Sequence, residues 1–196
     1  MNIKSRIQIF ILGLFHLNKS SKKGSKTFDR FKIVKTDITT LNVDAIVNSA
    51  HETLLGGSGV DGAIHEAAGS QLLEECKKLN GCEIGKAKIT KGYNLPAKYV
   101  IHTVAPHWQG GNKGEAKLLA SCYKESLKLA SKQGIKTIAF PSIATGAFGY
   151  RIERAAPIAL RTVFDYLGKH KEIEMVTFVV FSDEDKMSYG DALYVF

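Results

Sequence analysis

The sequence predicts an α/β domain with a central sheet that helices cover on both faces. Short apolar segments rich in β-branched residues, typical of buried strands, alternate along the chain with longer amphipathic segments typical of helices. Hydrophobic residues make up 44% and charged residues 23% of the 196 residues, a globular composition that excludes a largely disordered, collagen-like or coiled-coil chain. The length is sufficient for one domain with its own hydrophobic core.

Six segments are predicted as strands. Residues 31–35 alternate between apolar and charged side chains, as in a half-buried strand. Residues 44–48 contain a short β-branched run, as in a buried parallel strand. The other predicted strands are the apolar runs at 87–92, 99–104, 135–140 and 174–181.

Five segments are predicted as helices. Residues 60–68 are rich in alanine and carry Asp61 near the start, where the helix dipole favours a carboxylate. The longest predicted helix spans 114–133 and has an apolar side formed by Leu118, Leu119, Cys122, Leu127, Leu129 and Ala130. The remaining predicted helices are 71–79, 152–167 and 183–193.

The formal charge of +8 comes mainly from the first 26 residues. This segment holds six basic residues and no acidic one, so the rest of the chain holds 21 basic and 19 acidic residues, a net charge of +2. We therefore place a boundary at Thr27, between a basic extension (1–26) and a folded domain (27–196). The total charge suggests an anionic partner. Nucleic-acid binding would rest on the extension alone, and we regard it as the weaker alternative.

The basic extension leaves several roles open. Its apolar stretch, 7–17, is too short to span a bilayer comfortably. A basic start followed by an apolar run resembles a secretory signal, but no small-residue cleavage site follows, and the acid-free composition also suits an organellar transit peptide. A disordered extension and contact with a membrane stay open as well.

The cysteines favour a reducing compartment. Cys76, Cys82 and Cys122 are odd in number and form no C-x-x-C pair, so they indicate neither a disulfide framework nor a structural zinc site. Cys122 lies among leucines and is expected in the core. We therefore expect a cytoplasmic protein, with organellar targeting through residues 1–26 as the alternative.

Two loops of small residues follow predicted strands, at 56–59 and 142–149. Glycine lets backbone N–H groups converge on an anion, and a helix that starts after such a loop adds its positive dipole end. Two such loops at the carboxyl ends of strands favour a diphosphate site over simple tight turns. Neither loop matches the P-loop pattern or the dinucleotide fingerprint, which disfavours a P-loop NTPase and a hydride-transfer enzyme.

These loops belong to a longer series of motifs that resembles the macro domain family, in its MacroD-type branch. The resemblance rests on KTDIT at 35–39, VDAIVNSAH at 43–51, LLGGSGVDGAIH at 54–65, YVIHTVAP at 99–106 and PSIATGAFGY at 141–150. The motifs occur in the family's order and cover roughly residues 28–181. The resemblance implies a three-layer α/β/α fold with a mixed central sheet, and a protein that binds ADP-ribose.

The resemblance also implies a ligand-binding role for many residues. Asp37 would accept a hydrogen bond from the adenine amino group, and Ile38 would lie beside the adenine ring. Asp37 could instead cap a turn. Phe181 would stack on adenine, although a core position is the alternative. Asn48 would line the distal ribose, or else stabilise a turn. The two loops and a nearby tyrosine would hold the diphosphate and distal ribose through Gly56, Gly57, Ser58, Gly59, Val60, Ser142, Ile143, Ala144, Thr145, Gly146, Ala147, Phe148 and Tyr150.

The activity implied by the resemblance is hydrolysis of ADP-ribose esters. The substrates would be mono-ADP-ribosylated acidic side chains of proteins and O-acetyl-ADP-ribose. Such a reaction needs a positioned water and stabilisation of a tetrahedral intermediate. Asp61 would orient the water or the ribose or act as a general base, and capping of its helix is the simpler alternative role. The substrate's own phosphate could assist, and no metal or cofactor is expected.

One important position departs from the family pattern, beside smaller and tolerable changes at Thr36, Ser49, Ser58 and Ala144. His51 stands where the motif normally ends in asparagine, and histidine is larger and titrates near neutral pH. It could replace the ribose hydrogen bond, act as an extra base or obstruct the pocket. The predicted catalytic residues are thus Asp61, His51 and Asn48. We expect a monomeric hydrolase, with an ADP-ribose-binding module of little or no turnover as the alternative.

Overall fold

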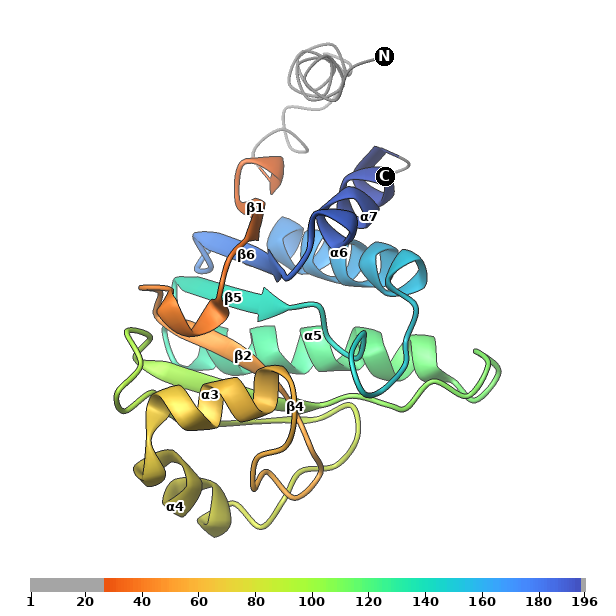
Figure 1. The fold of residues 1–196 in the computed structure, drawn as a ribbon. Helices are drawn as coiled ribbons and strands as arrows, with labels where there is room; N and C mark the ends of the chain where they lie inside the picture. Colours follow the sequence, from red (N-terminus) through yellow and green to blue (C-terminus); the bar gives the residue numbers. More distant parts are fainter. Residues whose placement is uncertain (1–26, 195–196) are drawn as a thin grey trace.

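The computed structural model describes residues 27–194, and they form an α/β domain around one six-stranded sheet (Figure 1). The basic extension lies outside the described residues. Within 27–194, no helix has the length and apolar character needed to cross a membrane. The elements in chain order are β1 (Phe31–Lys35), η1 (Ile38–Thr40), β2 (Ala45–Ala50), α3 (Val60–Ala68), α4 (Ser70–Lys78), β3 (Ala87–Lys91), β4 (Tyr99–Val104), α5 (Glu115–Lys132), β5 (Thr137–Pro141), α6 (Ile152–Lys169), β6 (Met175–Val180) and α7 (Asp183–Tyr194).

The sheet is mixed, as predicted. Its strand order is β1-β6-β5-β2-β4-β3. The first five strands in this order pair in parallel, and β3 pairs antiparallel with β4 at the edge. The parallel strands therefore all end at the same edge of the sheet, where ligands of open α/β sheets bind.

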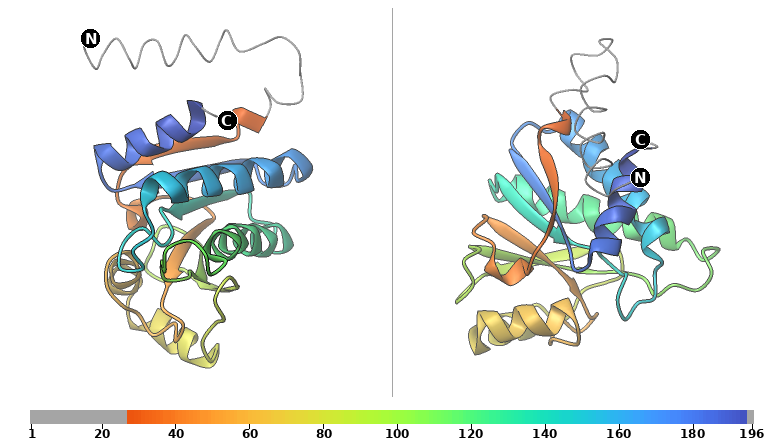
Figure 2. Two further views of the ribbon diagram at one scale, coloured as in Figure 1. Left: turned by 90° about the vertical axis from the view of Figure 1, so that its right-hand side faces the viewer. Right: turned by 45° about the horizontal axis from the view of Figure 1, so that its top comes forward.

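Helices cover both faces of the sheet, which gives the three predicted layers (Figures 1 and 2). Along β2, Ala45 and Val47 belong to the core shared with α5, α6 and α7. Ile46 and Ala50 belong to the core shared with α3 and α4. Because side chains alternate along a strand, Asn48 lies on the α3 and α4 side of the sheet.

All predicted strands and helices are present, with shifts of a few residues at some ends. The strand expected at 135–140 begins at Thr137, because the backbone N–H of Ile135 still bonds to Ala130 O at the end of α5, at 2.9 Å. The 3-10 turn at Ile38–Thr40 was not predicted, since three residues are too few to show a periodicity. Cys122 is buried in the core, as expected.

Candidate ligand-binding and catalytic site

The predicted site residues gather at the edge where the parallel strands end. Asp37 follows β1, the glycine-rich segment 51–59 follows β2, the segment 142–150 follows β5, and Phe181 follows β6. These four segments are far apart in the sequence. The topology brings them to one edge because the strands before them are parallel.

At one end of this edge, an exposed ring and a carboxylate follow neighbouring strands. Lys35 and Val180 are paired in the sheet, so Asp37 and Phe181 follow neighbouring strand ends. Phe181 is 92% exposed, which rules out the core position that the sequence left open. Asp37 caps η1, since its Oδ1 accepts the Thr39 N–H at 2.9 Å. Ile38 is buried beneath this corner.

The first loop depends on glycine at several positions. Gly56 and Gly59 have φ values of 84° and 61°, in the left-handed region that other residues rarely adopt. Gly59 is the N-cap of α3 and forms no side-chain cap hydrogen bond, so the first N–H groups of the helix face the loop. Ser58 is exposed and Val60 is partly exposed at this end of the helix. The arrangement is that of an anion site at a helix N-terminus.

The second loop is rigid at its base and exposed at its tip. Ile143, Ala144 and Tyr150 are buried, and the Tyr150 N–H bonds to Ala144 O at 3.0 Å. Ala144 has a φ of 69° although it is not glycine. The tip of the loop consists of Gly146 and Ala147, which are exposed, flanked by the partly exposed Ser142, Thr145 and Phe148.

The segment after β4 supports this second loop. The Trp108 N–H donates to Phe148 O at 2.8 Å, and the rings of Trp108 and Tyr150 lie 4.6 Å apart. The buried Glu115 carboxylate in turn accepts the N–H groups of Gln109 and Gly111. Tyr150 therefore acts as a support beneath the loop in this structure.

Asp61 lies at the centre of the edge and is 3% exposed. Its Oδ1 accepts a hydrogen bond from Asn48 Nδ2 at 2.7 Å, and its Oδ2 accepts the His51 N–H at 3.3 Å. These partners lie outside α3, so the carboxylate does not cap its own helix. Asn48 likewise binds Asp61 and does not stabilise a turn.

His65 is a further residue of this centre, and sequence reasoning missed it. Its Nε2 lies 3.5 Å from Asp61 Oδ1, one helical turn along α3, and forms no hydrogen bond to residues 27–194. The i, i+4 spacing of Asp61 and His65 was the signal in the sequence.

The His51 ring supports a turn in the structure. Its Nδ1 accepts the Thr53 N–H at 3.3 Å and lies 3.0 Å from Thr53 Oγ1. An asparagine side chain commonly accepts the N–H two residues ahead in the same way. The histidine ring thus keeps the local hydrogen bond that asparagine would make. The backbone N–H of His51 donates separately to Asp61.

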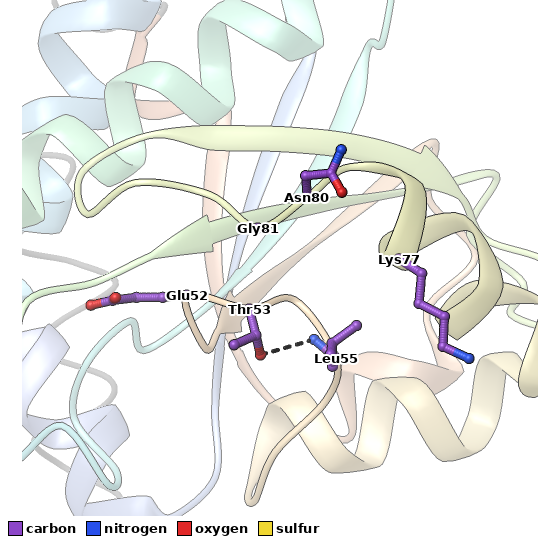
Figure 3. Close-up of a pocket in the computed structure, with 6 residues that line it drawn as sticks. All are labelled: Glu52, Thr53, Leu55, Lys77, Asn80 and Gly81. Atoms are coloured by element: carbon purple, nitrogen blue, oxygen red, sulfur yellow. Dashed lines mark hydrogen bonds between the residues drawn. The ribbon is translucent and has the colours of Figure 1, made fainter.

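An open hollow of about 500 Å³ lies behind this turn. Figure 3 shows the turn residues Thr53 and Leu55 on one side of it and Lys77, at the end of α4, on another. The Cys82 N–H donates to Glu52 O at 2.8 Å, and this hydrogen bond holds the turn against the segment that follows α4. The hollow adjoins the predicted ligand loops but is not lined by any predicted ligand residue.

Three potential metal ligands also meet near Asp61, which the sequence did not reveal. His65, Cys76 and His102 each offer one ligand atom, and these atoms lie within 4.8 Å of one another. Two features disfavour a metal here. His102 Nε2 already lies 2.9 Å from the Thr90 hydroxyl. Burial raises the pKa of the Cys76 thiol to about 11, which disfavours the thiolate that a metal would bind.

The close packing of Gly57 against Asp61 leads to a first prediction. A Cβ atom at Gly57 would lie 3.0 Å from Asp61 Oδ2, so Gly57→Ala would displace the carboxylate. We expect this variant to lower the rate of any reaction that depends on Asp61 by about tenfold or more. Gly168→Ala on α6 is the matched control, because nothing lies within 4 Å of its Cβ position and the residue lies outside the ligand loops. Equal losses in both variants would contradict the role of the Gly57 contact.

Comparison with known sequences places these features in context. The family model of the Macro domain matches residues 47–159. A macro domain-containing protein of Chlorobaculum tepidum is 61% identical over 160 residues, which cover 82% of this chain and 93% of the relative. ADP-ribose glycohydrolase MACROD2 of Homo sapiens is 53% identical over 163 residues, which cover 82% of this chain and 38% of MACROD2.

Comparison with solved structures also finds macrodomains. The macrodomain of Oceanobacillus iheyensis with ADP has a TM-score of 0.81 at 40% identity, covering 84% of this chain and 90% of that one. The macrodomain of Trypanosoma brucei in complex with ADP-ribose has a TM-score of 0.82 at 37% identity, and the match covers 90% of this chain and 72% of that one. These similarities confirm the predicted fold.

Proposed function

This chain belongs to the macro domain family, and on that basis we propose that it binds ADP-ribose and hydrolyses the ester that links mono-ADP-ribose to acidic side chains. The observation that carries the proposal is the buried Asp61 carboxylate, which faces His65 and receives hydrogen bonds from Asn48 and from the His51 backbone. The human relative MACROD2 is named an ADP-ribose glycohydrolase, which supports hydrolytic release of ADP-ribose without specifying the bond that breaks.

The edge of the sheet offers a place for each part of the ligand. In the proposed complex, adenine stacks on the exposed Phe181 ring, and its amino group donates to the neighbouring Asp37 carboxylate. The diphosphate lies between the loops 56–60 and 142–148, where backbone N–H groups and the start of α3 neutralise its charge. The distal ribose then reaches Asp61.

The proposed reaction is water attack on the ester carbonyl. Asp61 and His65 together orient the attacking water, and one of them takes its proton as the water oxygen bonds to the carbonyl carbon. The bond between this carbon and the ribose oxygen then breaks, and the leaving oxygen receives the proton that Asp61 or His65 took from the water. The products are the free carboxylic acid and ADP-ribose. O-acetyl-ADP-ribose carries an ester of the same kind, so we include it among the substrates.

The residue at position 51 keeps a second candidate function open, that of a binding module with little turnover. We expect His51→Ala to lower the rate of ADP-ribose release about two- to tenfold, because the turn loses the hydrogen bond to Thr53. His51→Asn should rescue the rate, since asparagine can accept the same N–H. An asparagine variant much faster than the wild type would instead favour the binding-module reading, with histidine as the defect.

The proposed bond specificity can be tested with two substrates. One protein would carry mono-ADP-ribose on glutamate or aspartate, and a control protein would carry it on arginine. We expect release of free ADP-ribose, measured by chromatography, from the first substrate only. Release from the arginine-linked control at a similar rate would overturn the proposal of an ester hydrolase. We further propose that the enzyme is a monomer and acts in the cytoplasm.

A further inference from the structure

A continuous chain of polar side chains runs beneath Asp61 on the α3 and α4 side of the sheet. Asn48 Nδ2 lies 2.7 Å from Asp61 Oδ1 and 3.1 Å from His102 Nδ1. His102 Nε2 lies 2.9 Å from Thr90 Oγ1. Asn48 and His102 are partners in the register of β2 and β4, so the chain crosses neighbouring strands. Asn48 and His102 are both fully buried.

The proton positions in this chain follow from one premise, that both oxygens of the Asp61 carboxylate accept hydrogen bonds, Oδ1 from Asn48 and Oδ2 from the His51 N–H. The Asn48 group that faces Asp61 must then be the NH₂ group. The same NH₂ group faces His102 Nδ1, which must therefore be an acceptor. A neutral imidazole with an accepting Nδ1 carries its proton on Nε2, where the Thr90 oxygen accepts it.

We propose that His102 is a positioning residue that, as the Nε2–H tautomer, holds the Asn48 amide with its NH₂ group on Asp61 and its carbonyl oxygen free. This inference rests on the proposed function, because Asp61 is the group that acts on substrate. The opposite tautomer would set an N–H against the Asn48 NH₂ group. The amide would then turn and place its oxygen against the Asp61 carboxylate, which is repulsive.

Two further observations support this assignment. Asn48 Oδ1 is buried and forms no hydrogen bond to the rest of residues 27–194, so the network leaves a carbonyl oxygen for a small donor such as a buried water. Burial, and secondarily the nearby His65, lower the pKa of His102 to about 3. His102 therefore stays neutral at any pH at which the protein is expected to work, and its hydrogen bonds to Asn48 and Thr90 select between the two neutral tautomers.

The tautomer can be measured directly in the full-length wild-type protein by nitrogen-15 NMR of the imidazole rings. The His102 signals are assigned by their disappearance in His102→Asn. We expect the proton on Nε2, an unprotonated Nδ1, and no titration between about pH 5 and 8. A proton on Nδ1, or a midpoint within this range, would overturn the inference.

The positioning role is tested with two variants of nearly equal shape. His102→Leu removes the acceptor for Asn48, and we expect kcat to fall about 10- to 100-fold with little change in KM. His102→Asn keeps an acceptor oxygen, and we expect it to recover most of kcat. An equal fall in kcat in both variants, or a rise in KM with unchanged kcat, would show that His102 has only a structural role.

The outcomes separate this inference from the proposed function. If the wild type releases no ADP-ribose, the proposed function fails whatever the tautomer is. If the wild type is active and the NMR shows the other tautomer, the inference alone fails. If His102→Leu does not fold, as judged by circular dichroism, the wild-type NMR measurement still decides the proton positions.

Discussion

Asp61→Asn is expected to slow release of ADP-ribose from glutamate- or aspartate-linked substrate by at least about 100-fold, the usual range for loss of a general base. The substitution keeps the shape of the side chain but removes its charge and its ability to accept a proton. The carboxylate is 3% exposed, and the groups that contact it are the Asn48 amide, the His51 backbone N–H and the His65 ring, none of which is an acid that would replace it.

The control is Glu66→Gln, which makes the same chemical change at an exposed position of α3. We expect this variant to release ADP-ribose at the wild-type rate. The affinity of Asp61→Asn for free ADP-ribose, measured by calorimetry, should change far less than the rate. An Asp61→Asn variant with full activity would remove Asp61 from the mechanism.

Phe181→Ala is expected to weaken ADP-ribose binding about 5- to 150-fold, because stacking of a base on an aromatic ring contributes about 1–3 kcal/mol. The ring is 92% exposed, so its removal should leave the melting temperature nearly unchanged. An exposed phenylalanine of this kind contributes little to the core, and a loss of affinity without a loss of stability is therefore diagnostic.

The control for Phe181 is Met187→Ala, a truncation of another exposed apolar side chain, on α7. We expect its affinity for ADP-ribose to equal that of the wild type. The comparison of ADP-ribose with ribose 5-phosphate, which lacks adenine, adds a second check. Phe181→Ala should not alter binding of the adenine-free ligand, and an equal loss for both ligands would place the ring elsewhere than on adenine.

The sequence predicted the fold well because its signals are local. Buried parallel strands give short β-branched runs, and α3 and α5 give apolar positions at helical spacing. The start of β5 was misplaced because Ile135 is buried like a strand residue, yet its N–H completes the end of α5. Hydrophobicity alone does not distinguish these two kinds of burial.

The site was predicted less completely because part of it depends on strand register. The loops and Asp61 could be found from motifs in consecutive residues. His102 is 54 residues from Asn48, and the two meet because β2 and β4 pair in parallel with these residues aligned. His65 was within reach, since its spacing from Asp61 places both on one side of α3. The turn contact of His51 needed coordinates, because it depends on the backbone of Thr53.

The most direct test of the proposed function is a single-turnover experiment with enzyme in excess over a protein that is mono-ADP-ribosylated on glutamate. Binding of ADP-ribose is measured on the same preparation, so that an inactive sample is recognised. We expect the wild type to release all ester-linked ADP-ribose in one exponential phase. Tight binding of ADP-ribose together with no release would contradict the hydrolase and leave this chain as a binding module.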